Sequence, residues 1–138
     1  MWHGPSLADL LGDVSAADAA ARPVPGAHTI WELVLHVTAW TRVVRERLGD
    51  RPTPEPTPEQ DWPPVKDMSA ESWRAAVEGL KAAHRELAED VEALDDAAFV
   101  ARVPDRDYTV IVMLHGLVEH DTYHGGQIAI LKRALGGP

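Results

Sequence analysis

Apolar residues recur at intervals of three and four along most of the chain, which is the spacing of one face of an α-helix. This pattern predicts four helical stretches, and no segment shows the alternation of a strand. The first stretch runs from Trp2 to about Val14, with Pro5 suited to its first turn. A further small turn is predicted from Ser15, because Asp18 stands at the distance of a capping box.

The second predicted helix opens at Thr29, whose hydroxyl and the Glu32 carboxylate fit a capping box. It runs to about Leu48 and stops at Gly49, a residue typical of helix ends. Its apolar positions form one stripe, made by Ile30, Leu33, Val37, Trp40, Val44 and Leu48. This stripe predicts a helix with one face against a core.

A stretch rich in proline, residues 49–67, separates the second helix from the third and holds six of the eleven prolines. It predicts an extended, semi-rigid connector that is neither helix nor central strand. At ~3.1 Å per residue it could reach ~55 Å, more than the ~30 Å length of a 20-residue helix. The chain can therefore return along the second helix and begin the third helix parallel to it, whereas a short loop would force antiparallel neighbours.

The third predicted helix spans about Ala70 to Leu94, with Ser69 as its N-cap. A second connector, residues 95–107, leads to Thr109, which is expected to cap a fourth helix running to about Leu135. Together these stretches predict an all-α four-helix bundle that forms a single domain over residues 1–138.

The amino-acid composition narrows the range of possible functions. The 138 residues carry 13 basic and 22 acidic side chains, a formal net charge of −9, which argues against nucleic acid or an anionic membrane surface as a partner. The chain has no cysteine, which excludes disulfides, a thiolate metal cage and a cysteine nucleophile. No apolar stretch is long enough for a membrane span and no secretory signal is visible, so we expect a cytoplasmic protein.

Two histidines occupy core-facing positions of the fourth helix. They belong to an otherwise apolar stripe with steps of three and four, made by Met113, Leu117, His120, His124, Ile128, Leu131 and Leu135. Residues four apart on one helical face have β-carbons about 6 Å apart, so the two imidazoles could share one cation. The alternative is a pair of core histidines that are hydrogen-bonded to neighbouring groups.

A third ligand would have to come from another helix. His36 lies at the edge of the inward stripe of the second helix, and His84 lies on the inward face of the third. Either could complete a three-nitrogen site that leaves a fourth position to water, the pattern of catalytic zinc.

The segments "HVTAW" and "LVEHDTYHGGQIAIL" resemble the DinB-like superfamily of metal-binding four-helix bundles, and the resemblance covers nearly the whole chain. It implies that His36, His120 and His124 bind a divalent ion, usually nickel or zinc, and that His84 is a supporting or core histidine. It also implies an up-down-down-up bundle and frequent homodimers. This chain departs from the family in its shorter first helix.

The remaining histidines and two glycines of the last helix allow less specific predictions. His3 and His115 are expected to be solvated or capping, as is His28, which could also line the mouth of a pocket. Gly125 and Gly126 lack β-carbons and would let a helix or ligand approach.

Two polar residues follow the histidines of the fourth helix. Gln127 could orient a ligand histidine or a substrate, although an exposed glutamine is equally consistent with its position. Asp121 makes the motif His-Asp-x-x-His, one methylene short of the metalloprotease motif, but the predicted fold is wrong for that class.

Three functional hypotheses follow. The first is a metal-dependent small-molecule enzyme, either a transferase that uses a low-molecular-weight thiol or a hydrolase. The second is a non-catalytic metal-binding protein of a stress or detoxification response. The third is a helical bundle whose histidines bind no metal, and the family resemblance makes it the least favoured of the three.

Overall fold

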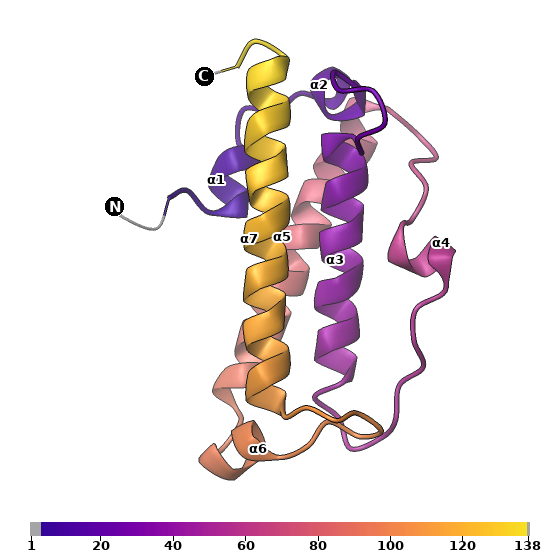
Figure 1. The fold of residues 1–138 in the computed structure, drawn as a ribbon. Coiled ribbons are helices and arrows are strands. Elements are labelled where there is room, and N and C mark those ends of the chain that lie inside the picture. The colour runs from indigo at the N-terminus through magenta and orange to yellow at the C-terminus, as the bar shows by residue number, and fades with distance from the viewer. Residues whose placement is uncertain (1–3, 138) are drawn as a thin grey trace.

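The computed structural model describes residues 4–137. Within this range the regular secondary structure is helical, apart from one isolated bridge between Arg102 and Thr109 (Figure 1). The predicted all-α class is confirmed. The helices are α1 (Leu7–Leu11), α2 (Ala16–Ala20), α3 (Ile30–Glu46), α4 (Pro58–Asp61), α5 (Ala70–Glu92), α6 (Asp96–Val100) and α7 (Val110–Ala134).

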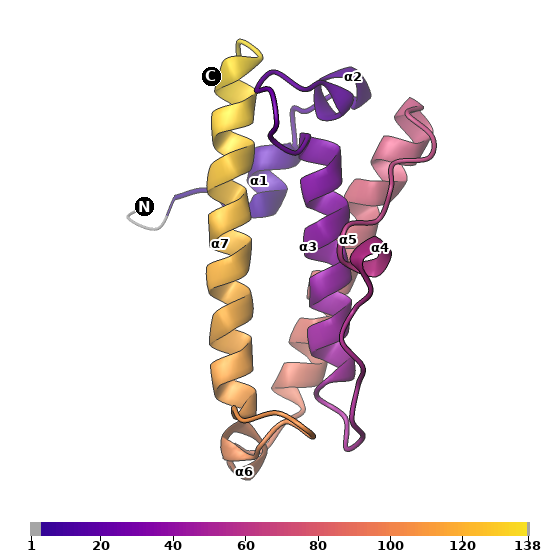
Figure 2. The ribbon, with the colours of Figure 1, turned by 45° about the vertical axis from the view of Figure 1, so that its right-hand side comes forward.

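The three long helices, α3, α5 and α7, lie side by side and make the body of the bundle (Figures 1 and 2). The connector that contains α4 passes beside α3 and carries the chain back, so that α5 starts at the same end of the molecule as α3. The helix α7 then runs back in the opposite direction. Because α3 packs against both α5 and α7, it is the central element.

The predicted ends of the long helices agree with the structure to within about two residues at each end. The hydroxyl groups of Thr29 and Ser69 accept the expected capping hydrogen bonds, from the backbone amides of Glu32 and Ser72. Thr109 is the N-cap residue of α7, but its side chain makes no capping hydrogen bond, so that detail of the prediction was wrong.

The prediction of one helix from Trp2 to Val14 is wrong. The first helix, α1, is only five residues long, because it begins after the N-cap Ser6 and ends at Gly12. Pro5 precedes this cap instead of lying in the first turn, and Trp2 falls outside the residues that the structure describes. The small turn predicted from Ser15 is confirmed as α2, with the Ser15 hydroxyl accepting from the Asp18 amide.

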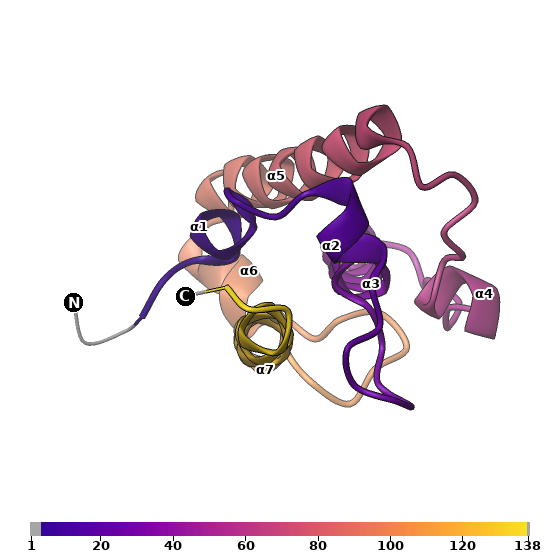
Figure 3. The same cartoon turned by 90° about the horizontal axis from the view of Figure 1, so that it is seen from above.

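Two short helices therefore take the place of the expected first long helix. Seen from above, α1 lies beside α5 and α7, while α2 lies over the end of α3 (Figure 3). A β-carbon on Gly125 of α7 would lie 3.4 Å from the Leu7 side chain, so this glycine lets α1 approach closely, as predicted.

The connectors are also more ordered than predicted. The stretch 49–67 contains α4, which starts with Pro58 directly after Thr57; a proline is tolerated at this position because the first helical N–H needs no partner within the helix. Thr57 and Gln60 form a capping box. The second connector contains α6, capped by Asp95.

The core divides into two groups of buried residues along the bundle. One surrounds Trp31, Leu33 and Trp73 near the start of α3, and the other surrounds Val44 and Met113 near its end. Along α7 the polar cluster described below lies between these two groups, after Leu117 of one and before Ile128 of the other. No helix among residues 4–137 is long and apolar enough to cross a membrane.

Candidate metal centre

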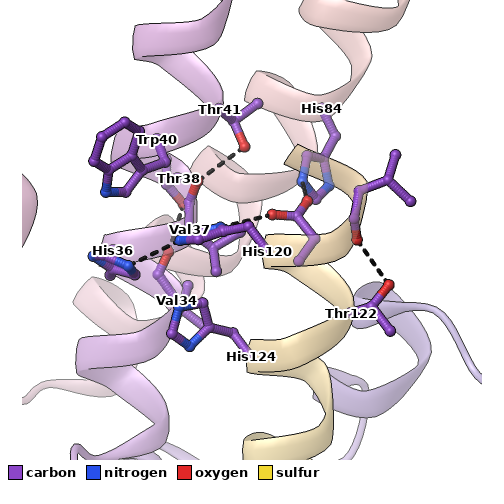
Figure 4. A network of polar contacts seen from close by, with 12 residues as sticks. Val34, His36, Val37, Thr38, Trp40, Thr41, His84, His120, Thr122 and His124 are labelled. Atoms are coloured by element: carbon purple, nitrogen blue, oxygen red, sulfur yellow. Dashed lines mark hydrogen bonds and ion pairs between the residues drawn. The ribbon is translucent and has the colours of Figure 1, made fainter. Parts of the chain in front are cut away.

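Three histidines from two helices, α3 and α7, point toward one another (Figure 4). His36 comes from α3, and His120 and His124 come from successive turns of α7. His36 and His124 are 5% and 6% exposed, and His120 is partly buried. One ligating nitrogen from each ring lies within 4.8 Å of the others, so the three residues could hold a metal ion.

The closest pair within this group is formed by the Nε2 atoms of His36 and His120, which are 3.0 Å apart. Two nitrogens bound to one zinc ion at ~2.0–2.1 Å would lie about 2.9–3.4 Å apart for bond angles between 90° and 109°. The observed separation falls inside that range. The structure thus brings together the three residues that the sequence resemblance implied.

The Nδ1 atom of each ring faces a hydrogen-bond acceptor. In His36 it lies 2.7 Å from the backbone oxygen of Asp61, and in His124 it lies 2.7 Å from Oε1 of Gln127. In His120 it lies 3.4 Å from Oδ1 of Asp121. A backbone oxygen and a carboxylate can only accept, so Nδ1 of His36 and of His120 is the protonated nitrogen, and a ring with this single proton carries its lone pair on Nε2.

This proton arrangement makes the short contact between His36 and His120 informative. Two Nε2 lone pairs 3.0 Å apart repel each other unless a proton or a cation lies between them. The chemistry of the donor set therefore fits a shared cation. In metal sites generally, the other nitrogen of a ligand histidine donates to a carboxylate or a carbonyl oxygen, as the Nδ1 atoms do here.

Residues of the proline-rich connector hold His36 from outside the bundle. The Trp62 ring stacks on the His36 ring, with 3.8 Å between the ring centroids. The Trp62 ring also stacks on the His28 ring, with 3.6 Å between the ring centroids. The Asp61 carboxylate accepts a hydrogen bond from Trp40 Nε1 at 2.6 Å. The connector is thus part of the site, and not only a spacer.

Asp61 and Trp62 were not predicted as site residues from the sequence. The available signal was an Asp-Trp pair in a stretch otherwise made of small, charged and proline residues. Its meaning depends on the connector crossing α3 at the level of His36, and helical periodicity does not report where a connector crosses.

His84 takes a supporting position. Its Nε2 lies 2.9 Å from Oδ2 of Asp121, while the other oxygen of that carboxylate faces Nδ1 of His120. His84 is therefore linked to the cluster through Asp121 and does not join the three nitrogens. This agrees with the role that the family resemblance implied.

Burial and neighbouring charge keep two of the rings neutral. Burial lowers the pKa of the His36 imidazole below its ordinary value, and the rings of His124 and His120 lower it further, against the hydrogen bond to Asp61. Burial also lowers the pKa of His124, partly offset by its hydrogen bond to Gln127. Neutral imidazole is the form that binds metal.

The pKa of the Asp121 carboxyl group is lowered, whereas burial alone would raise the pKa of an acid. Burial raises the pKa of Asp121, but its hydrogen bonds with His120 and His84 outweigh burial, and its pKa lies below the ordinary value. The carboxylate is therefore ionised at neutral pH. Its negative charge lies next to a group of rings that could hold a cation.

The remaining predictions have mixed outcomes. His115 is exposed, as expected, and His28 lines a cavity together with Gln127, as expected for a pocket mouth. Gln127 accepts a hydrogen bond from the candidate ligand His124, which confirms the prediction that it orients a ligand histidine. A β-carbon on Gly126 would meet nothing within 4 Å, and His3 lies outside the described residues.

The fold and the site together define a helical bundle with a buried histidine cluster between two of its long helices. The sequence model of the DinB superfamily matches residues 2–128. The chain belongs to the DinB superfamily. Comparison with curated proteins and with solved structures gives no match.

Proposed function

We propose that His36, His120 and His124 bind one divalent metal ion, nickel or zinc, and that the bound ion serves a small-molecule enzyme. The observation that carries the proposal is the 3.0 Å contact between the Nε2 atoms of His36 and His120, whose Nδ1 atoms both face acceptors. A cation between the rings removes the repulsion of two lone pairs. Family membership supports the same assignment.

A nickel or zinc ion held by three imidazoles would supply a Lewis acid with a coordination position left for water or an external thiol. The chain's own residues orient the three rings. The backbone oxygen of Asp61 and Oε1 of Gln127 hold the Nδ1 protons, and this points the Nε2 lone pairs into the cluster. Trp62 covers the His36 ring and keeps water from that side.

The reaction that we propose is a thiol-dependent transfer or a hydrolysis. The thiol must be a low-molecular-weight compound from outside, because the chain has no cysteine. A cavity of about 360 Å³ beside His120 supports an enzyme, since it could hold a small substrate.

A non-catalytic metal-binding protein of a stress or detoxification response is the second candidate. One observation favours it: the nearest carboxylate, Asp121, is already engaged by His84 and His120. It is therefore poorly placed to act as a general base, which must reach the proton that it removes.

Metal content of the purified protein tests the site. We expect about one nickel or zinc ion per chain in the wild type, measured by inductively coupled plasma mass spectrometry, and loss of the ion in His36→Ala, His120→Ala and His124→Ala. The control is His115→Ala, an exposed histidine on the same helix, which should keep the ion. A wild type that binds neither ion after reconstitution would refute the proposal.

Activity assays on the metal-loaded protein then separate the two candidates. Turnover in a panel of thiol-transfer and ester-hydrolysis reactions, lost with the ion in His120→Ala, supports the enzyme. Stoichiometric metal without turnover in any reaction supports the binding protein.

We also propose that the protein is a cytoplasmic homodimer that pairs through the outer face of α7. This face supports the proposal because three apolar side chains that share one side of the helix are more than half exposed: Val112, Tyr123 and Ile130. Exposed apolar side chains gathered on one helix are typical of an interaction surface. Light scattering should give a dimer mass that falls to the monomer mass in Ile130→Glu, and a monomeric wild type would contradict this.

A further inference from the structure

A cavity of about 360 Å³ lies between α3 and α7 and has His120 in its wall. This volume is at the lower end of the range for small-molecule sites. Its walls are mostly apolar, formed by Trp40, Val44, Met113 and Leu117 among others. The exposed residues Val112 and Gly116 also line it, so the cavity reaches solvent.

The cavity lining includes Gly116, a glycine that steric crowding does not explain. Gly116 lies inside α7, where glycine is the least favourable residue after proline. A β-carbon built on it would meet nothing within 4 Å, so the glycine does not serve a close helix contact. It stands one turn before His120 on the same helical face, where a side chain would occupy the cavity.

Arg47 gives the cavity a charged end. It follows His36 by eleven residues, and at 1.5 Å per residue this places the two about 16 Å apart along the helix direction. Arg47 is only 5% exposed, and its guanidinium carbon lies 5.7 Å from the ring centroid of Trp40.

Positive charge at this end exceeds negative charge. Arg47 donates to Thr53 Oγ1, to the Tyr108 hydroxyl at 3.1 Å and to Glu55 at 3.0 Å. Glu55 also pairs with Arg106 at 2.9 Å, so one carboxylate faces two guanidinium groups. These bonds use three of the five N–H donors of Arg47, one on each nitrogen, and the other two donors belong to Nη1 and Nη2.

From this arrangement we propose that the cavity binds a small apolar molecule that carries a carboxylate. The carboxylate faces Arg47 and Tyr108, the apolar body lies along Trp40 and Leu117, and the opposite end lies beside His120. Guanidinium groups recognise carboxylates through paired N–H donors, and burial strengthens this interaction. The inference rests on the proposed function only in treating this molecule as the substrate of the metal centre.

The test uses 4-phenylbutyrate and its neutral analogue 4-phenyl-1-butanol as probes, with isothermal titration calorimetry on the full chain, both zinc-loaded and metal-free. We expect the acid to bind once per chain and at least tenfold more tightly than the alcohol. Arg47→Gln should reduce the affinity for the acid to that for the alcohol.

Gly116→Leu should fill the cavity and weaken binding of the acid at least tenfold without disturbing neighbours. Its control is Gly79→Leu on α5, away from the cavity, where a β-carbon would make only an ordinary 3.8 Å contact with Arg42. Circular dichroism checks the fold of each variant. Should Arg47→Gln not fold, the comparison of acid with alcohol and the Gly116→Leu variant decide the matter.

Equal affinities for acid and alcohol, wild-type binding by Gly116→Leu, or no saturable binding of either probe would each overturn the inference. Binding of the acid that disappears on metal removal but survives in Gly116→Leu would also overturn it, because the carboxylate would then bind the metal itself. Metal content measured on the same samples reports the proposed function separately. Loss of probe binding in Gly116→Leu with metal retained is the result that we expect.

Discussion

Gln127 accepts the Nδ1 proton of His124 at 2.7 Å, at the short end of the range for N–H···O hydrogen bonds. Replacing it by alanine removes the acceptor and leaves the ring free to turn. Loss of such a partner from a metal-bound histidine costs 10–100-fold in metal affinity, or about 1.4–2.7 kcal/mol. A single neutral hydrogen bond contributes only about 0.5–1.5 kcal/mol net. The two ranges meet near 1.4 kcal/mol, so we expect Gln127→Ala to bind zinc about tenfold more weakly.

The same substitution should leave the metal-free fold intact. Because the buried His124 ring loses its acceptor in the metal-free protein as well, we expect the free energy of unfolding to fall by about 0.5–1.5 kcal/mol, which a folded domain tolerates. Competition with a chromogenic zinc chelator measures the affinity, and urea unfolding of the metal-free protein measures the stability. Gln127→Glu keeps an acceptor and should bind zinc at least as tightly as the wild type. Equal zinc affinity in Gln127→Ala and the wild type would refute the reasoning.

Three further predictions address acid stability, helix packing and the connector. The folded-state pKa values of His36 and His124 lie below the ordinary value of about 6.5, so the unfolded chain binds more protons in acid. Urea unfolding of the metal-free protein should therefore show stability falling as the pH drops below about 6.5; pH-independent stability would contradict this. Gly125→Val should lower the free energy of unfolding by about 1–3 kcal/mol, because a β-carbon there already lies 3.4 Å from Leu7. Trp62→Ala should weaken zinc binding about tenfold in the chelator assay with unchanged circular dichroism, since it uncovers His36.

The long helices could be predicted because local signals and the hydrophobic period agree over many turns. Thr29 and Ser69 mark the starts of α3 and α5 by side-chain hydrogen bonds that need no tertiary contact. The first stretch misled the prediction because Leu7, Leu11 and Val14 keep a helical spacing across the end of α1 at Gly12. Two short helices can present the same apolar face as one long helix, so the period alone does not separate them.

The structure of the proline-rich connector was harder to predict, for a different reason. Proline is read as a helix breaker, yet at the first position of α4 Pro58 removes only an N–H that has no partner within the helix. The roles of Asp61 and Trp62 depend on where the connector crosses α3. That crossing is set by packing between distant segments, which leaves no periodic trace in the residues themselves.

The choice between His36 and His84 illustrates what geometry adds to spacing. Both lie on inward faces of their helices, so the sequence pattern alone left both open as the third ligand. Successive residues of a helix project about 100° apart, and α7 uses this at two neighbouring positions: His120 turns toward α3 and Asp121 toward α5. His36 consequently meets His120 at 3.0 Å, whereas His84 meets Asp121 at 2.9 Å. Since Asp121 also faces Nδ1 of His120, the competing histidine acts on the proposed ligand set by holding the carboxylate that orients one of its rings.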